Sequence, residues 1–160
     1  MTDSDTLMLT RMEKQSFSVI GKAGSTNDGE GFIARLWDDA NAHFPEIAHL
    51  ALTDESGCPR GIWGCMTDFS GQFLPWEDHF SRGCYLAGVE CQPNAKAPDG
   101  WSLWTVPGFV YLITENQSSE TFSDTVRYLS DHHIPLVGAV QEYTTPADGK
   151  TYLCFPVERL

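Results

Sequence analysis

Three acidic side chains stand inside, or at the end of, apolar segments that are typical of β-strands. Asp68 and Glu142 lie within such segments, and Glu90 closes another. Burying a carboxylate among apolar groups is unfavourable unless the group reaches solvent or has a charged partner. These acids therefore either face water on one side of a half-exposed sheet or line a polar hollow, and the pattern leaves both interpretations open.

Aromatic residues accompany these acids, since Phe, Trp and Tyr make up 12% of the chain. Many of them must belong to the hydrophobic core. An acid in an aromatic cleft would select a bulky, flat, lipophilic cation, because each ring face attracts a cation by roughly 0.5–2 kcal/mol and the carboxylate supplies the counter-charge. The aromatic residues in expected strands and helices include Trp37, Trp63, Tyr85, Trp104, Phe109, Tyr111 and Tyr143.

No sequence motif indicates covalent, metal or nucleotide chemistry. The loop from Gly24 to Gly31 lacks a following Lys-Ser or Lys-Thr pair, and its two acids would repel phosphate. The five cysteines contain no CxxC pair, and the five histidines lack HExxH spacing. The run Trp76-Glu77-Asp78-His79 is interpreted as a solvated loop tip. We therefore expect no catalytic residue, no metal and no cofactor.

The elements that would position these residues occur in the same order in both halves of the chain. In the first half, hydrophobic periodicity predicts a strand at residues 16–21, a helix at 32–50 interrupted at Pro45, and strands at 61–69 and 84–91. The second half has an apolar run at 109–113, a helical pattern at 120–133 and two further strands. The order is strand, helix, strand, strand in each half.

Individual residues support a duplication. The segment Gly64 to Ser70 aligns with Gly138 to Thr144, and this alignment places Asp68 over Glu142. One such unit cannot bury its apolar face alone, so the two copies should join around a cleft. We predict an α+β fold of duplicated β-α-β-β units with pseudo-twofold symmetry: an antiparallel sheet, two main helices and a central ligand cleft. The predicted single domain spans residues 1–160, with a poorly ordered lead-in at 1–15, repeat one at about 16–92 and repeat two at about 102–160.

Composition limits the classes of partner. The 160 residues carry 10 Lys and Arg against 22 Asp and Glu, a formal net charge of -12. Such a chain repels phosphate backbones, so we expect no direct binding to nucleic acid. The first 15 residues contain no apolar run, which argues against a signal peptide or membrane anchor. We expect a cytoplasmic protein with reduced cysteines.

Short motifs along most of the chain resemble the GyrI-like or AraC-type effector-binding family. They are Phe17-Ser18-Val19-Ile20-Gly21, Leu36-Trp37, Tyr85-Leu86-Ala87-Gly88-Val89-Glu90, Val106-Pro107-Gly108, Glu142-Tyr143 and Phe155-Pro156-Val157. The chain is most similar to the stand-alone, integron-associated subgroup. The resemblance implies an aromatic pocket for organic molecules, often cationic drugs, with Glu142 as the glutamate near its base. The family usually has Glu-x-Tyr in this strand, so the register decides whether Gln141 or Glu142 faces the cleft.

These observations give one principal hypothesis and two alternatives. The first is a non-enzymatic module that binds lipophilic cationic compounds for drug or effector sensing or sequestration, with a transcriptional partner or a homo-oligomer. The resemblance also allows a hydrolase of strained electrophilic natural products, with Glu142 as base and Tyr143 or Tyr111 orienting the substrate. The third is a gyrase-inhibitor-like interaction protein. The ligand-binding residues expected for the first hypothesis are Glu142, Tyr143, Trp37, Trp63, Tyr85, Glu90, Trp104, Phe109 and Tyr111.

Overall fold

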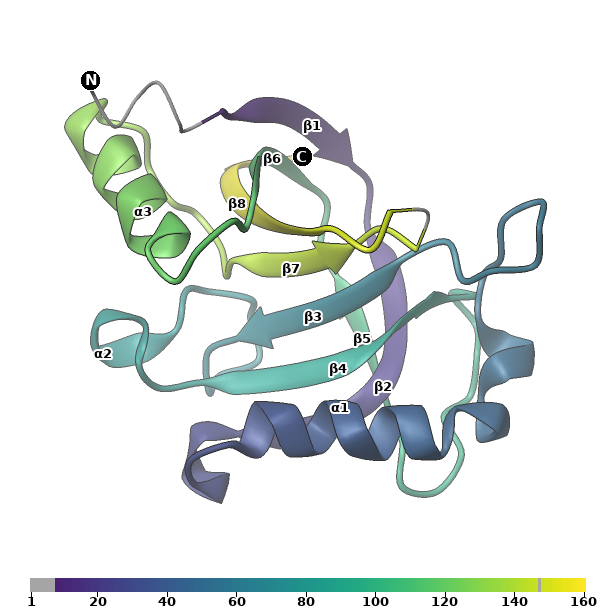
Figure 1. Ribbon diagram of the computed structural model, residues 1–160. Helices are drawn as coiled ribbons and strands as arrows, with labels where there is room; N and C mark the ends of the chain where they lie inside the picture. Colours follow the sequence, from purple (N-terminus) through teal and green to yellow (C-terminus); the bar gives the residue numbers. More distant parts are fainter. Residues whose placement is uncertain (1–7, 147) are drawn as a thin grey trace.

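The computed structural model describes residues 8–146 and 148–160, which form an eight-stranded antiparallel sheet with helices on one face (Figure 1). The strands are β1 (Thr10–Lys14), β2 (Phe17–Ser25), β3 (Ile62–Thr67), β4 (Cys84–Cys91), β5 (Ser102–Val106), β6 (Phe109–Glu115), β7 (Gln141–Thr144) and β8 (Thr151–Arg159). The helices are α1 (Phe32–Ala42), α2 (Glu77–Phe80) and α3 (Thr121–Asp131). Short 3-10 turns lie at Thr26–Asp28, Phe44–Glu46 and Ala48–Leu50.

The sheet order, β1-β6-β8-β7-β3-β4-β2-β5, is symmetric about the seam between β3 and β7. One unit, β2-α1-β3-β4, lies in one half of the sheet, and β6-α3-β7-β8 lies in the other half, with β5 and β1 at the outer edges. Antiparallel pairing across the seam places Gly64 opposite Glu142 and Ile62 opposite Thr144. The α+β fold of two β-α-β-β units predicted from the sequence is confirmed.

The lead-in expected at residues 1–15 requires a correction. Residues 1–7 lie outside the described part of the chain, but Thr10–Lys14 forms β1 and pairs with β6. Met12 is the one strongly apolar residue of this strand and packs against the core, so the segment has too little hydrophobic periodicity to signal a strand. Pairing with Tyr111 and its neighbours supplies the order that the local sequence does not predict.

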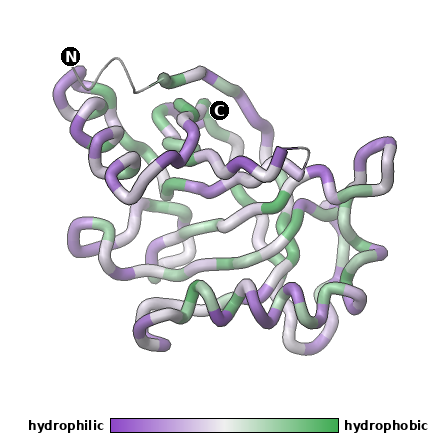
Figure 2. The backbone as a smooth tube through the Cα atoms, in the orientation of Figure 1, coloured by the Kyte–Doolittle hydropathy of each residue, from purple (hydrophilic) through white to green (hydrophobic). Residues whose placement is uncertain are grey.

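The first helix is shorter than its periodicity suggested. It ends at Ala42, and two 3-10 turns continue the apolar pattern to Leu50. Pro45 occupies the start of the first of these turns, where its missing N–H does not interrupt an α-helical hydrogen bond. Hydrophobic and hydrophilic residues alternate along α1, as expected for a helix with one face on the sheet (Figure 2).

The sheet has two differently covered faces, because successive strand residues point to opposite sides. On one face, α1 packs over Tyr85 and Ala87, and α3 packs over Leu153 and Phe155. The other face encloses a separate core that includes Val19. No helix among the described residues is both long and apolar enough to cross a membrane.

Candidate ligand-binding site

Glu142 lies in the middle of the sheet, on the face that carries the helices. Its neighbour Gln141 points to the opposite side and is fully buried. The Gln141 amide accepts a hydrogen bond from the Met66 N–H at 2.9 Å and donates to the Met66 and Ala139 carbonyls at 3.1 and 3.0 Å. Gln141 therefore ties β7 to β3, and the alternation of the strand directs Glu142 toward the helices.

A chain of hydrogen bonds links Glu142 to α1. The Tyr85 hydroxyl donates to Glu142 Oε1 at 2.6 Å, and the Trp37 indole N–H donates to the same hydroxyl at 3.0 Å. Tyr85 is 1% exposed, and the Trp37 and Phe32 rings meet it edge-on at 6.4 and 6.5 Å. Packing thus fixes the phenol ring, and the phenol in turn holds one carboxylate oxygen. We call Trp37, Tyr85 and Glu142 the polar trio.

Gly64 provides the space in which the trio meets. It lies opposite Glu142 across the seam. A Cβ atom built on Gly64 would overlap both the Tyr85 hydroxyl and the Glu142 carboxylate. A glycine is therefore required here by close approach of two functional side chains rather than by a turn.

The Glu142 carboxylate is enclosed, and no residue of the described ranges supplies a counter-ion. Burial raises the pKa of Glu142, and the hydrogen bond from Tyr85 only partly opposes this effect. Burial, and then the neighbouring Glu142 charge, raise the pKa of Tyr85, so its hydroxyl stays protonated as a donor. Among the ion pairs formed by the described residues, none includes Glu142.

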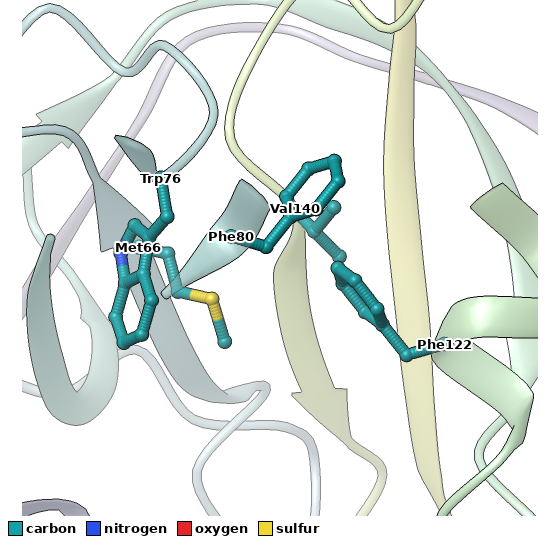
Figure 3. Close-up of a pocket in the computed structure, with 5 residues that line it drawn as sticks. All are labelled: Met66, Trp76, Phe80, Phe122 and Val140. Atoms are coloured by element: carbon teal, nitrogen blue, oxygen red, sulfur yellow. The ribbon is translucent and has the colours of Figure 1, made fainter. Parts of the chain in front are cut away.

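An apolar pocket of about 190 Å³ lies on the same face of the sheet (Figure 3). Met66 and Val140, which are two residues from Gly64 and Glu142 respectively, line it together with Trp76, Phe80 and Phe122. Phe80 from α2 and Phe122 from α3 meet across the pocket with ring centroids 5.2 Å apart. We call this the α2–α3 pocket.

None of the three aromatic residues that line the α2–α3 pocket, Trp76, Phe80 and Phe122, was among the expected site residues. Trp76 is the first residue of the run Trp76-Glu77-Asp78-His79, for which the sequence predicts a solvated loop tip, and Phe80 directly follows that run. The intervening Glu77, Asp78 and His79 are exposed, as expected, but the two aromatic residues turn back to the sheet. The Trp76 indole N–H donates to the Cys84 carbonyl at 3.0 Å. The sequence feature that could have indicated this pocket is the pair of large aromatic residues on either side of a polar loop tip.

Five of the expected aromatic site residues lie on the other face of the sheet. The Trp63 and Tyr143 rings pack against each other there in a tilted arrangement, with ring centroids 4.7 Å apart. Trp63 precedes Gly64 and Tyr143 follows Glu142, so strand alternation points their side chains to the face away from Glu142. This second core includes the buried residues Trp63, Phe109 and Tyr111. Tyr143 and Trp104 are partly buried and pack against it. The structure therefore separates Tyr143 and Tyr111 from the proposed base of the hydrolase alternative, and Tyr85 is the tyrosine in contact with Glu142.

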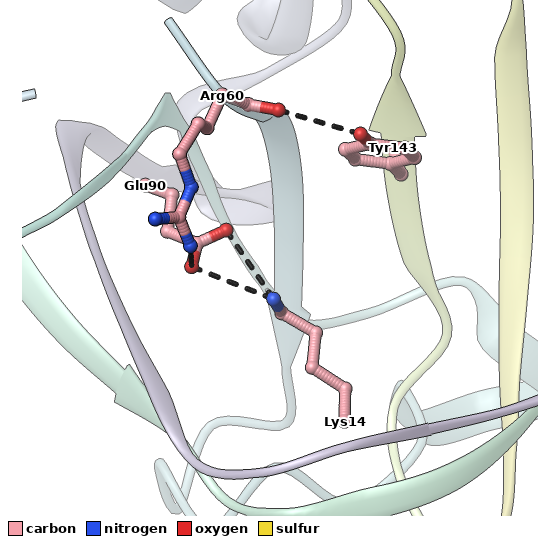
Figure 4. A network of polar contacts seen from close by, with 4 residues as sticks. All are labelled: Lys14, Arg60, Glu90 and Tyr143. Atoms are coloured by element: carbon pink, nitrogen blue, oxygen red, sulfur yellow. Dashed lines mark hydrogen bonds and ion pairs between the residues drawn. The ribbon is translucent and has the colours of Figure 1, made fainter. Parts of the chain in front are cut away.

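Glu90 is also on this second face, and its charge is neutralised within the chain (Figure 4). The Lys14 ammonium lies 3.3 and 3.4 Å from its two carboxylate oxygens, and the Arg60 guanidinium lies 3.7 Å away. Lys14 also sits over the Phe17 ring at 4.5 Å. Nearby, the Tyr143 hydroxyl donates to the Arg60 carbonyl at 3.4 Å. The lysine of β1 thus occupies the cation position that Glu90 could otherwise offer.

Asp68, which aligns with Glu142 in the duplication, forms its hydrogen bonds within a loop. Its carboxylate accepts hydrogen bonds from the Ser70 hydroxyl at 2.6 Å, the Thr67 hydroxyl at 3.2 Å and the Leu74 N–H at 3.3 Å. Burial tends to raise the pKa of Asp68, but these hydrogen bonds outweigh it, so the pKa is lowered. Within residues 8–146 and 148–160, no group of three or more His, Cys, Asp or Glu side chains is arranged to hold a metal ion.

Comparison with known proteins shows the fold. No protein-family model matches the sequence. The structure is similar to that of SAV2435 bound to tetraphenylphosphonium, with a TM-score of 0.66 and 17% identity over 94% of each chain. It is also similar to the C-terminal domain of EcmrR (TM-score 0.64, 14% identity, 96% of this chain and 99% of that one). An integron cassette protein from Vibrio cholerae has a TM-score of 0.58 and 14% identity, covering 94% of this chain and 95% of its own. The GyrI-like fold predicted from the sequence resemblance is confirmed.

Proposed function

We propose that the protein is a non-enzymatic module that binds lipophilic organic cations in the cleft between α1 and α3, for sensing or sequestering a drug or effector. The observation that carries this proposal is the Glu142 carboxylate, which is enclosed beside an apolar pocket and forms no ion pair within the described chain. The other two strand acids are each satisfied by groups of the protein itself. Glu142 is the strand acid whose charge an external cation would neutralise.

The surroundings of Glu142 favour an organic cation over a hydrated metal ion. A hard metal ion requires several oxygen ligands, whereas Glu142 brings one carboxylate and the hydroxyl of Tyr85. A quaternary ammonium or phosphonium ion loses little hydration on entering an apolar site. Its substituents can fill the α2–α3 pocket, and the rings of Trp76, Phe80 and Phe122 present apolar and π surfaces to it. The similar fold of SAV2435, which binds tetraphenylphosphonium, supports this choice of ligand class.

The charge requirement can be tested with two ions of the same shape. Titration of the protein with tetraphenylphosphonium should give saturable binding with quenching of tryptophan fluorescence. Tetraphenylborate, which differs mainly in the sign of its charge, should bind at least tenfold more weakly, because Glu142 would repel it. Equal affinity for the two ions would contradict the proposal.

A matched pair of variants locates the charge. Glu142→Gln should weaken phosphonium binding by about tenfold to a hundredfold, in line with the ~1–3 kcal/mol expected for a charged hydrogen-bonding partner. Glu158→Gln removes the same charge from an exposed position and should change the affinity by less than twofold.

Recovery of the probe unchanged by mass spectrometry would support binding without turnover. A chemical product would favour the hydrolase alternative.

A further inference from the structure

A second apolar pocket lies at the other end of β3 on the same face. Its volume is about 170 Å³, and its lining includes Trp37, Phe44, Ile47, Ile62 and Trp101. These residues come from α1, the turns that follow it, the start of β3 and the segment before β5. We call this the α1 pocket. Its walls are largely aromatic and aliphatic, as are those of the α2–α3 pocket.

The strand register places Glu142 between the two pockets. Ile62, Gly64 and Met66 alternate with residues of the opposite face and therefore share one side of β3. Ile62 lines the α1 pocket, Met66 lines the α2–α3 pocket, and Gly64 lies opposite Glu142. The two pocket-lining positions are four residue steps apart along the strand, a span of about 13 Å at roughly 3.3 Å per residue.

The polar trio connects the carboxylate to the α1 pocket. Trp37 lines that pocket, and its indole N–H is bonded to the Tyr85 hydroxyl, which is bonded to Glu142. The Tyr85 hydroxyl occupies the space that a side chain at position 64 would fill. The floor between the pockets therefore consists of hydrogen-bonded polar groups that contain one negative charge, with an apolar hollow at each end.

Neither pocket alone has the volume of a usual drug site. A cavity of about 150 Å³ holds a single benzene molecule, whereas drug-sized ligands usually occupy about 300–1,000 Å³. Each pocket here is close to the first of these values. Only a ligand that uses both pockets would reach the lower end of the second range.

We propose that the preferred ligand is an elongated cation with a central charge and two apolar arms, one in each pocket, whose terminal rings lie about 13 Å apart. This proposal rests on the proposed function, because Glu142 supplies the central counter-charge. It adds a shape requirement that a compact cation does not meet. Trp37 and Ile62 on one side, and Met66 and Phe122 on the other, then determine which arms are accepted.

A ligand series tests the shape requirement on the unaltered protein. A dimethylammonium ion with two 3-phenylpropyl arms should bind at least tenfold more tightly than trimethyl(3-phenylpropyl)ammonium, because the second ring is also removed from water. The corresponding ion with two benzyl arms should show little of this gain, since its rings are too close together to reach both pockets. Tributyl(3-phenylpropyl)ammonium controls for general lipophilicity, because it has a similar carbon count and one ring.

Two matched substitutions test the pockets separately. Ile62→Trp and Met66→Trp each place a large side chain two residues from Gly64 on the same face of β3, one toward each pocket. Each variant should weaken binding of the two-armed ion at least fivefold. Each should change binding of the one-armed ion by no more than about twofold, because the other pocket remains open. Loss of affinity in only one variant would mean that a single pocket is used, and would overturn the proposal.

The outcomes separate this inference from the proposed function. Should Glu142→Gln weaken both the one-armed and two-armed ions while the two bind the native protein equally, the elongated-ligand inference fails and the cation site stands. If Glu142→Gln leaves both affinities unchanged, the proposed function itself fails. Thermal melting shows whether each tryptophan variant is folded, and the native ligand series decides the matter if either variant is not.

Discussion

At the scale of single residues, three acids of similar sequence context differ in what surrounds their charge. Glu90 is paired with Lys14 and Arg60, and Asp68 is bound by hydroxyl and N–H donors of its own loop. Among the described residues, Tyr85 alone donates a hydrogen bond to the Glu142 carboxylate, and burial raises the pKa of Glu142. Lys14 is 76 residues from Glu90 in the sequence, so no local pattern could show that Glu90 was already neutralised.

The raised pKa of Glu142 makes cation binding depend on pH. Because burial raises the folded-state pKa above the ordinary value of 4.5, the group takes up a proton at a higher pH in the folded protein than in the unfolded one. Affinity for a permanent cation such as tetraphenylphosphonium should therefore be full well above the Glu142 pKa and fall as the pH drops through that pKa. Binding near that pKa should release protons, which calorimetry in buffers of different ionisation enthalpy measures.

Two variants check that Glu142 is the titrating group. Glu142→Gln should remove the pH dependence of phosphonium binding between neutral pH and about 4. Tyr85→Phe should move the midpoint to higher pH, since the hydrogen bond from Tyr85 lowers the Glu142 pKa. A midpoint that stays unchanged in both variants would assign the titration to another residue.

Gly64 gives a prediction about stability and binding together. Gly64→Ala places a methyl group on the Tyr85 hydroxyl and the Glu142 carboxylate, so it should lower the free energy of unfolding by about 1–3 kcal/mol, as overpacking of a fitted site does. It should also weaken phosphonium binding by separating Tyr85 from Glu142. Gly108→Ala is the control, because its nearest contact would be 3.3 Å and away from the site. Urea denaturation should show a clearly larger loss for Gly64→Ala than for this control.

At the scale of elements, the order and type of the main strands and helices could be predicted, but the face of each strand could not. Hydrophobic periodicity and the duplication identified β2, α1, β3 and β4 and their counterparts β6, α3, β7 and β8. Alternation shows that Trp63 and Gly64 face opposite sides, yet it does not show which side the helices cover. That depends on contacts between distant segments, such as Trp37 with Tyr85. Several strand aromatics were therefore expected in the cleft and instead build the second core.

The short helix α2 has a strained backbone whose relief should be measurable. Asp78, His79 and Phe80 have φ angles of 51°, 57° and 65°, in the left-handed region that disfavours residues with a Cβ atom by roughly 1–2 kcal/mol each. His79 is exposed. His79→Gly should raise the free energy of unfolding by up to about 1 kcal/mol, after allowing for the greater freedom of glycine in the unfolded chain.

His79→Ala is the matched control for this strain. It removes the imidazole and keeps the Cβ atom, so its stability should stay within about 0.5 kcal/mol of the native protein. Chemical denaturation of the two variants side by side distinguishes them. Equal stability of the glycine and alanine variants would show that the left-handed backbone at this position is not a source of strain.

At the scale of the whole molecule, the duplication explains where the cleft lies, and the net charge sets the field around it. Two similar units meet at the β3–β7 seam, and their helices α1 and α3 cover the outer parts of each half-sheet. The seam is the region that neither helix covers fully, and Glu142 and the α2–α3 pocket lie on it. The site is therefore asymmetric although the scaffold is symmetric. Asp68 accepts hydrogen bonds from its own loop, whereas Glu142 accepts one from Tyr85 in the cleft.

The formal charge of -12 should affect how fast a cation arrives more than how long it stays. Association of a cationic rhodamine-type dye, followed by stopped-flow fluorescence, should slow several-fold between about 20 and 500 mM salt, because the Debye length shrinks from roughly 20 Å to about 4 Å. Dissociation should change little, since Glu142 is mostly enclosed and is screened less than surface charges. Glu142→Gln should retain the salt dependence of association, which arises from the remaining acidic surface, and should dissociate faster. A variant that lost the salt dependence while keeping the native dissociation rate would show that Glu142 guides the ligand from outside the cleft instead of holding it within.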